Sequence, residues 1–281
     1  MTDQPVPREV VLSSGDRLEV IRRLGGGRTN DVLLVRHSGR CLVLKVARRP
    51  GGSLSVEARA LRILNEARFP APILVTEAAL DQPRLPCLLL SPIRGRAPRG
   101  AHEHELAGLL LAELHETPSR PALPEADAGD ALGAARGVAQ KLGTEDRRAV
   151  TAALAPLGEP WLDRVFAHGD ASPENTLVTS DGPVFIDFER AREGPAGLDL
   201  GRFSFLVASG ADVESPEPLV EAFRAGYAAR RPLPRDLHSW TVLAGLLLAA
   251  WRLRWRAAPA TPDWRAALEL TRDLARRRPA S

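Results

Sequence analysis

The residues best suited to chemistry are residues 168–175, which read HGDASPEN, and residues 186–189, which read IDFE. Between them, two short apolar runs flank the turn-rich residues 179–183 and predict a β-hairpin. Closing this hairpin brings Asn175, just before its first strand, to the end that holds Asp187, just after its second. A carboxamide and a carboxylate oxygen, completed by water and phosphates, are ligands that Mg²⁺ takes in proteins. The pair therefore predicts a magnesium site.

Asp170 supplies a third oxygen donor on the same loop. Such a carboxylate can orient a hydroxyl group and accept its proton while the hydroxyl attacks a phosphorus atom. An ordinary turn, in which Asp170 and Asn175 cap backbone groups, is a simpler alternative. A His-x-Asp metal hydrolase is a third, but the chain has six histidines and no second cluster with metal-ligand spacing.

Lys45 lies centrally in the apolar residues 42–46, and Lys141 is the only other lysine among the 38 basic residues. An unpaired ammonium is costly to bury in a strand. Glu57, on the helix expected next, is the natural counter-charge, and such a pair holds a lysine against nucleotide phosphates. The alternative is an edge-strand lysine whose ammonium reaches solvent.

Gly25, Gly26 and Gly27 link two expected strands, so their backbone amides can approach phosphates closely. The turn matches neither Gly-x-Gly-x-x-Gly nor the Walker pattern. Only its position, one strand before Lys45, favours a phosphate cradle over an ordinary hairpin turn.

The elements that must position these residues fall into two groups. Apolar or alternating runs predict strands at 18–24, 31–36, 41–47, 73–76 and 87–90, with an amphipathic helix at 55–67. Helical periodicity then covers 102–116, 130–157 with a break near Gly143, 218–230, 234–257 and 262–278, and a strand-rich stretch at 165–188 interrupts it. We therefore expect an α+β fold of two lobes. Residues 1–93 form a small antiparallel sheet with one helix, and residues 94–281 form a larger, mainly helical lobe.

Composition limits where the protein works. With 281 residues, 44% of them hydrophobic, the chain can bury a full core. Its longest uncharged apolar run, residues 240–251, is shorter than the roughly 20 residues that span a bilayer. Residues 1–10 lack the apolar stretch of a signal peptide, and Cys41 and Cys87 both suit small buried hydrophobes in a reducing compartment. We expect a cytoplasmic protein with no membrane partner.

The net charge of +3 gives no strong field for nucleic acid. Residues 102–130 hold seven acids against one arginine, and residues 181–221 hold nine against three, so each stretch carries a net −6. This acidic middle favours a cationic ligand, although charges sorted by chance over a solvated surface explain it equally well.

In order along the chain stand a glycine turn, a strand lysine, a helix glutamate, a hinge, the His-Gly-Asp loop and the Asp187 segment. This order resembles the protein-kinase-like superfamily. His168-Gly169-Asp170 with Asn175 is similar to the aminoglycoside phosphotransferase and choline kinase branch, which has His-Gly-Asp where protein kinases have His-Arg-Asp. Residues 111–115 (LAELH) and 197–201 (GLDLG) are also similar to segments of that family. The resemblance covers nearly the whole chain and implies the two-lobed kinase fold.

The resemblance implies a role for each matching residue. Asp170 would be the catalytic aspartate, and Asn175 and Asp187 would bind magnesium. Lys45, paired with Glu57, would contact the phosphates of ATP.

It also implies that His168 braces the catalytic loop, and that Ser91 and Ile93 of the hinge meet adenine through main-chain groups. Pro92 departs from the family pattern because it has no amide hydrogen to donate. Glu189 departs from the Asp-Phe-Gly of protein kinases, and its role as a metal contact or a substrate contact stays open.

The function implied is an ATP- and magnesium-dependent transfer of a phosphoryl group to a hydroxyl of a small molecule. The acidic middle favours an aminoglycoside or another amine-bearing antibiotic or metabolite. Kinases of the choline, homoserine or thio-sugar type are the first alternative. A pseudokinase that binds without turnover is the second, and every expected catalytic position is filled.

Overall fold

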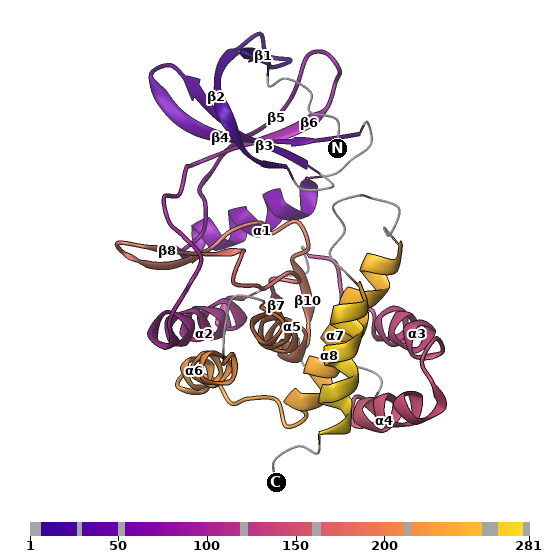
Figure 1. Cartoon of the computed structure of the whole chain (residues 1–281). Coiled ribbons are helices and arrows are strands. Elements are labelled where there is room, and N and C mark those ends of the chain that lie inside the picture. Colours follow the sequence, from indigo (N-terminus) through magenta and orange to yellow (C-terminus); the bar gives the residue numbers. More distant parts are fainter. Residues whose placement is uncertain are drawn as a thin grey trace.

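A computed structural model of the chain describes residues 7–26, 30–49, 54–118, 123–158, 164–210, 215–254 and 264–277. A β-rich lobe lies above a mainly helical lobe, with helix α1 (Ser55–Glu66) on the side of the sheet that faces the helical lobe (Figure 1). The α+β, two-lobed architecture expected from the sequence is therefore confirmed. The division between residues 93 and 94 stays a prediction.

The β-rich lobe is one antiparallel sheet in the order β1-β2-β3-β4-β6-β5. Its strands are β1 (Glu9–Val11), β2 (Arg17–Gly26), β3 (Asn30–His37), β4 (Arg40–Ala47), β5 (Leu74–Ala79) and β6 (Pro86–Leu90). Strands predicted from apolar runs form within a few residues of their expected bounds. Helix α1 buries Ala58, Leu61 and Leu64, which recur every three residues on one face.

Cys41 is exposed, whereas Cys87 is buried, so the expectation of two buried thiols was wrong for Cys41. The reason is the length of the neighbouring strand. β6 pairs with β4 only from Val43 to Val46, so the first residues of β4 extend beyond the covered part of the sheet.

The helical lobe contains α2 (Ala101–Glu116), α3 (Ala128–Ala139), α4 (Thr144–Leu154), α5 (Ala196–Ala208), α6 (Glu217–Ala228), α7 (Leu237–Arg254) and α8 (Trp264–Arg276). The predicted break near Gly143 separates α3 from α4. Helix α5 was not predicted, because its first turns contain three residues of low helix propensity, Gly197, Asp199 and Gly201. None of the helices in the described ranges is long and apolar enough to cross a membrane.

Close helix packing explains those glycines. A Cβ atom on Gly197 would overlap the indole of Trp240, and one on Gly201 would overlap the Trp240 carbonyl. Helix α5 can therefore lie directly against α7 only with glycine at both positions. Gly108 and Gly226 allow the same close approach between α2 and α6.

Two short ladders hold the central loops of the helical lobe. Strands β8 (Thr176–Thr179) and β9 (Gly182–Phe185) form the predicted hairpin. Strand β7 (Val165–Ala167) pairs with β10 (Arg192–Gly194). The ladders anchor residues 168–175 and 186–191 at both ends, and these two loops carry the candidate site.

Candidate active site

Strand alternation decides where Lys45 points. Leu44 and Val46 pack into the cluster on one face of the sheet, so Lys45, between them, faces α1 and the space between the lobes. There its Nζ lies 2.6 Å from Oε2 of Glu57, and both side chains are buried. The predicted pair is therefore present, and the edge-strand alternative does not hold.

The charge of Lys45 is held by more than one acid. Its Nζ also lies 2.6 Å from Oδ1 of Asp187 and 3.8 Å from Oε2 of Glu189. Burial opposes the charge, but the carboxylates of Glu57 and Asp187 outweigh it and raise the pKa of Lys45 above its ordinary value. The pKa of Glu57 is raised to about 6, because burial outweighs the attraction of Lys45 and Asp187 adds like-charge repulsion.

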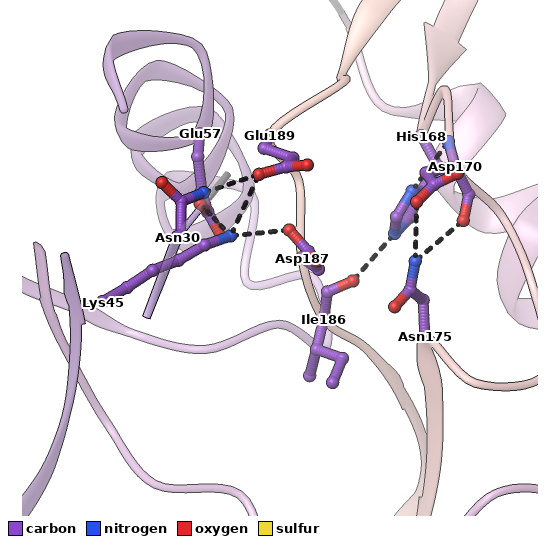
Figure 2. A network of polar contacts seen from close by, with 9 residues as sticks. All are labelled: Asn30, Lys45, Glu57, His168, Asp170, Asn175, Ile186, Asp187 and Glu189. Atoms are coloured by element: carbon purple, nitrogen blue, oxygen red, sulfur yellow. Dashed lines mark hydrogen bonds and ion pairs between the residues drawn. The ribbon is translucent and has the colours of Figure 1, made fainter. Parts of the chain in front are cut away.

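Glu189 faces the β-rich lobe. Its Oε2 accepts a hydrogen bond of 2.6 Å from Nδ2 of Asn30, at the start of β3 (Figure 2). The contact links the end of the glycine turn with the segment that follows β9. Glu189 therefore lies with Lys45 and away from Asp170. The sequence had left the position of Glu189 relative to these two residues open. Nothing in the sequence pointed to Asn30, because its burial depends on contact between the lobes.

His168 connects the two central loops. Its ring is fully buried between Phe185 and Phe188, with Nε2 at 3.0 Å from the carbonyl oxygen of Ile186. Nδ1 accepts a hydrogen bond of 3.3 Å from the backbone N–H of Asp170. These contacts require a neutral ring protonated at Nε2. They are the contacts expected of the predicted brace.

Gly169 is required by its conformation and by its neighbour. Its φ is +76°, and a Cβ atom there would overlap the carbonyl oxygen of Arg190. The two loops approach so closely that no larger residue fits between His168 and Asp170 without moving one of them.

Asp199 of α5 holds the backbone of the loop formed by residues 168–175, a contact that was not predicted. Its carboxylate accepts the backbone N–H of His168 at 2.6 Å and that of Gly169 at 2.9 Å. It also lies 3.2 Å from Nε2 of His115. Burial opposes the charge, yet the hydrogen bonds from His115 and from the backbone N–H of Gly169 help to lower the pKa of Asp199. Residues 197–201 (GLDLG), which are similar to a segment of the family, could have pointed to this contact, but the sequence alone does not assign Asp199 a role.

Asn175 and Asp187 meet at one end of the β8–β9 hairpin, where the N–H of Ile186 bonds the carbonyl oxygen of Asn175 at 3.0 Å. Nδ2 of Asn175 donates to the Asp170 carbonyl oxygen at 2.9 Å and to Oδ2 of Asp170 at 3.3 Å. Within the residues that the structure describes, no hydrogen bond reaches Oδ1 of Asn175 or Oδ2 of Asp187, so both oxygens can accept another ligand (Figure 2). Both are hard oxygen ligands on one side of Asp170.

These residues fit a divalent cation. The carboxylates of Glu57, Asp187 and Glu189 outnumber the ammonium of Lys45, which leaves negative charge beside the two oxygens. No group of three or more His, Cys, Asp and Glu side chains in the described ranges is arranged to hold a metal alone. A site for Mg²⁺ here would therefore need water and phosphate oxygens as further ligands.

Asp170 has a partner that was not predicted. Its Oδ1 contacts the guanidinium of Arg202, three residues after Asp199 on the same helix. Positions i and i+3 share a helix face, so α5 contacts both the backbone and the carboxylate of the catalytic loop. The alternative in which Asp170 is only a turn residue does not explain this half-buried ion pair.

The hinge, residues 91–93, has few backbone N–H groups that a ligand could use. The N–H of Ser91 donates to the Ile73 carbonyl oxygen at 2.9 Å, and the Ser91 hydroxyl accepts from the Ile73 N–H at 2.8 Å. Because Pro92 has no N–H and that of Ser91 is used, the N–H of Ile93 is the backbone donor of these three residues that is left for a ligand, and the carbonyl of Ser91 is an acceptor close to it.

The glycine turn is described only in part. Gly25 and Gly26 end β2 and pair with Val32 and Asp31, whereas Gly27 lies outside the described residues. Phosphate binding by the glycine turn stays a prediction.

Solved structures share the fold of this chain. The chain is similar to choline kinase from Cryptosporidium parvum Iowa II (16% identity, TM-score 0.62, covering 92% of this chain and 88% of that one). It is similar to a microcompartment-associated aminopropanol kinase (21%, 0.65, 94% and 90%). A third is an amicoumacin kinase in complex with AMP-PNP, Ca²⁺ and Ami (13%, 0.68, 95% and 90%). At these identities the likeness shows the kinase fold. No curated protein matches the chain by sequence.

The family follows from the sequence itself. The model of the phosphotransferase enzyme family, APH, matches residues 20–240. The chain belongs to this family, and the resemblance read from its motifs is confirmed.

Proposed function

We propose that this protein is an ATP- and magnesium-dependent kinase that transfers the γ-phosphoryl group to a hydroxyl of a small molecule. The observation that carries the proposal is the meeting of Asn175, Asp187 and Asp170 at one end of the β8–β9 hairpin. The Lys45–Glu57 pair faces the same place from the other lobe, and Lys45 contacts Asp187.

Each residue has a task in the proposed reaction. Lys45, held by Glu57, binds the phosphates, and Ser91 and Ile93 bind adenine through one carbonyl and one N–H. Asn175 and Asp187 would hold magnesium, whose charge would offset that of the phosphates. Asp170 orients the acceptor hydroxyl and takes its proton, while His168 keeps this loop beside the metal segment.

The acceptor belongs to the same proposal. Amine-bearing antibiotics and metabolites, aminoglycosides included, are the first class to test, and choline, homoserine and thio-sugars are the second. The acids behind the amine prediction are largely paired elsewhere. Glu103 binds Arg96, and Glu113 and Glu116 lie near Arg230. The acceptor must therefore be found by assay.

The test is incubation of the purified protein with Mg²⁺-ATP and these acceptors, with the mass of each acceptor recorded. A gain of one phosphoryl mass that requires Mg²⁺ supports the kinase. If ATP binds tightly and no acceptor gains mass under any condition, a binding-only pseudokinase replaces the proposal. The cytoplasmic location stays a prediction, which fractionation of cells would check.

A further inference from the structure

A positively charged side chain, that of Arg202, lies beside the carboxylate of Asp170. In the proposed function the acceptor hydroxyl approaches Asp170, and the Arg202 guanidinium already contacts that carboxylate. The Nε atom of Arg202 is buried and has no hydrogen-bond partner among the described residues. A guanidinium here therefore has binding capacity that the protein itself does not use.

Two further arginines follow the metal segment, and with Arg202 they form what we call the arginine cluster: Arg190, Arg192 and Arg202. Nε of Arg192 donates to the Arg190 carbonyl oxygen at 3.0 Å and packs against Gly169 of the catalytic loop. Burial lowers the pKa of Arg192, and the charges of Arg190 and Arg202 lower it further. Burial also lowers the pKa of Arg202, against the attraction of Asp170. The three charges are thus close enough to repel one another.

The nearby acids do not neutralise this cluster. The carboxylate of Asp199 accepts hydrogen bonds from the backbone amides of His168 and Gly169 and contacts His115. Glu174 attracts Arg202 only from beyond ion-pair distance. Within the described part of the chain, neither Arg190 nor Arg192 forms an ion pair with a carboxylate. Asp170 pairs with Arg202, which leaves Arg192 half-buried without a carboxylate at ion-pair distance, and a partly buried charge without a partner is costly.

We propose that the acceptor carries an anionic group, a carboxylate or a phosphate, and that Arg192 and Arg202 bind it beside Asp170. This inference rests on the proposed kinase function and names the chemistry of its acceptor. A guanidinium binds both anions through paired N–H groups. Binding transfers Arg202 from Asp170 to the acceptor anion, so that Oδ1 of Asp170 is released to receive the hydroxyl. An acceptor amine is compatible with this site only alongside such an anion, so the inference places acceptors such as homoserine before the aminoglycosides, which carry no anion.

The nucleotide is the other source of anionic oxygens. In Figure 2 its predicted phosphate ligand, Lys45, lies with Asp187 and Glu189, whereas Asp170 lies with His168 and Asn175. Because Arg202 contacts Asp170, the arginine cluster belongs to the acceptor side. The two anion sites can then be separated by mutating one arginine and one lysine.

The first experiment compares acceptors that differ only in the anion, namely homoserine with homoserine amide, and 3-hydroxypropanoate with 3-hydroxypropanamide. With Mg²⁺-ATP, kcat/KM for the acid is expected to exceed that for its neutral partner by at least tenfold. Arg192→Gln and Arg202→Lys should reduce this ratio toward one. Arg36→Gln, which removes an exposed arginine paired with Glu19 on the β-rich lobe, should leave it unchanged. Equal or better use of the neutral acceptors would overturn the inference.

The second experiment does not depend on turnover. Binding of inorganic phosphate is measured by calorimetry at constant ionic strength, with thermal unfolding of each variant as the folding control. Binding should persist in Lys45→Met and weaken at least tenfold in Arg192→Gln. Binding that is lost in Lys45→Met and kept in Arg192→Gln would place the anion in the nucleotide site and refute the inference. If no acceptor is phosphorylated but phosphate binding requires Arg192, the anion site stands and the proposed kinase function fails.

Discussion

At the scale of single residues, the raised pKa of Glu57 makes a prediction about pH. As the pH falls through about 6, Glu57 becomes protonated and Lys45 loses a counter-charge. We expect KM for Mg²⁺-ATP to rise below this pH, and the rise to be absent in Glu57→Gln, whose amide does not titrate. Glu77→Gln, in the same lobe, should retain it.

The same group has the opposite effect on folding. Because its pKa is higher in the folded state than in the unfolded chain, the stability contributed by protonated Glu57 is complete below the ordinary value of 4.5. It is lost as the pH rises through about 6. The difference between the unfolding free energies of the protein and of Glu57→Gln should therefore change between about pH 4.5 and about pH 6 and stay constant at higher pH. Identical pH profiles for the two proteins would show that Glu57 does not titrate there.

Gly169 gives a second prediction at this scale. Gly169→Ala adds left-handed strain of about 1–2 kcal/mol and a collision with the Arg190 carbonyl, which displaces Asp170. Gly39 has the same φ of +76° in an open turn, so Gly39→Ala carries the strain without the collision. We expect similar strain in both variants and loss of phosphoryl transfer only in Gly169→Ala. Equal activity of the two would remove the loop contact from the mechanism.

Residues of the site differ in how far the sequence predicts them. The Lys45–Glu57 pair was predictable because a rare lysine in an apolar strand needs a counter-charge. The meeting of Asn175 with Asp187 followed from a hairpin read in the turn residues. Arg202 was not predictable, because its pairing depends on how α5 packs.

At the scale of elements, α5 is the support of the catalytic loop. Asp199→Asn removes the charge that two backbone amides and His115 share, and the expected loss of stability is about 2 kcal/mol. Asp146 is a matched control, since it is a buried acid paired with Arg272 and Arg276 on α8. We expect Asp199→Asn and Asp146→Asn both to unfold at lower denaturant concentration, and only Asp199→Asn to lose kcat by tenfold or more. Unchanged kcat in Asp199→Asn would make α5 a purely structural helix.

Elements were predictable where periodicity is strong. The strands around Lys45 and the helices α1, α2, α6 and α7 follow from apolar spacing. Helix α5 was missed because Gly197 and Gly201 read as breakers, although their task is close contact with Trp240. Packing between helices far apart in sequence overrides local propensity at such positions.

At the scale of the whole molecule, the nucleotide and its metal should hold the two lobes together. Lys45 of the β-rich lobe contacts Asp187 of the helical lobe, and Asn30 contacts Glu189. Mg²⁺-ATP at 100 times its Kd should stabilise the fold by about 2.7 kcal/mol. In Asp187→Asn the part that depends on Mg²⁺ should vanish, whereas Asp181→Asn in the hairpin turn should keep it. Thermal unfolding with ATP, with and without EDTA, measures both.

The role of Asp170 is the central claim, and one measurement tests it most directly. Asp170→Asn keeps the size of the side chain and removes the base. It is assayed for phosphoryl transfer to any accepted substrate and, in the same sample, for binding of Mg²⁺-ATP. We predict transfer reduced at least a hundredfold with ATP affinity within a few fold of the parent protein. Transfer at the parent rate would contradict the assignment of the base and, with it, the mechanism.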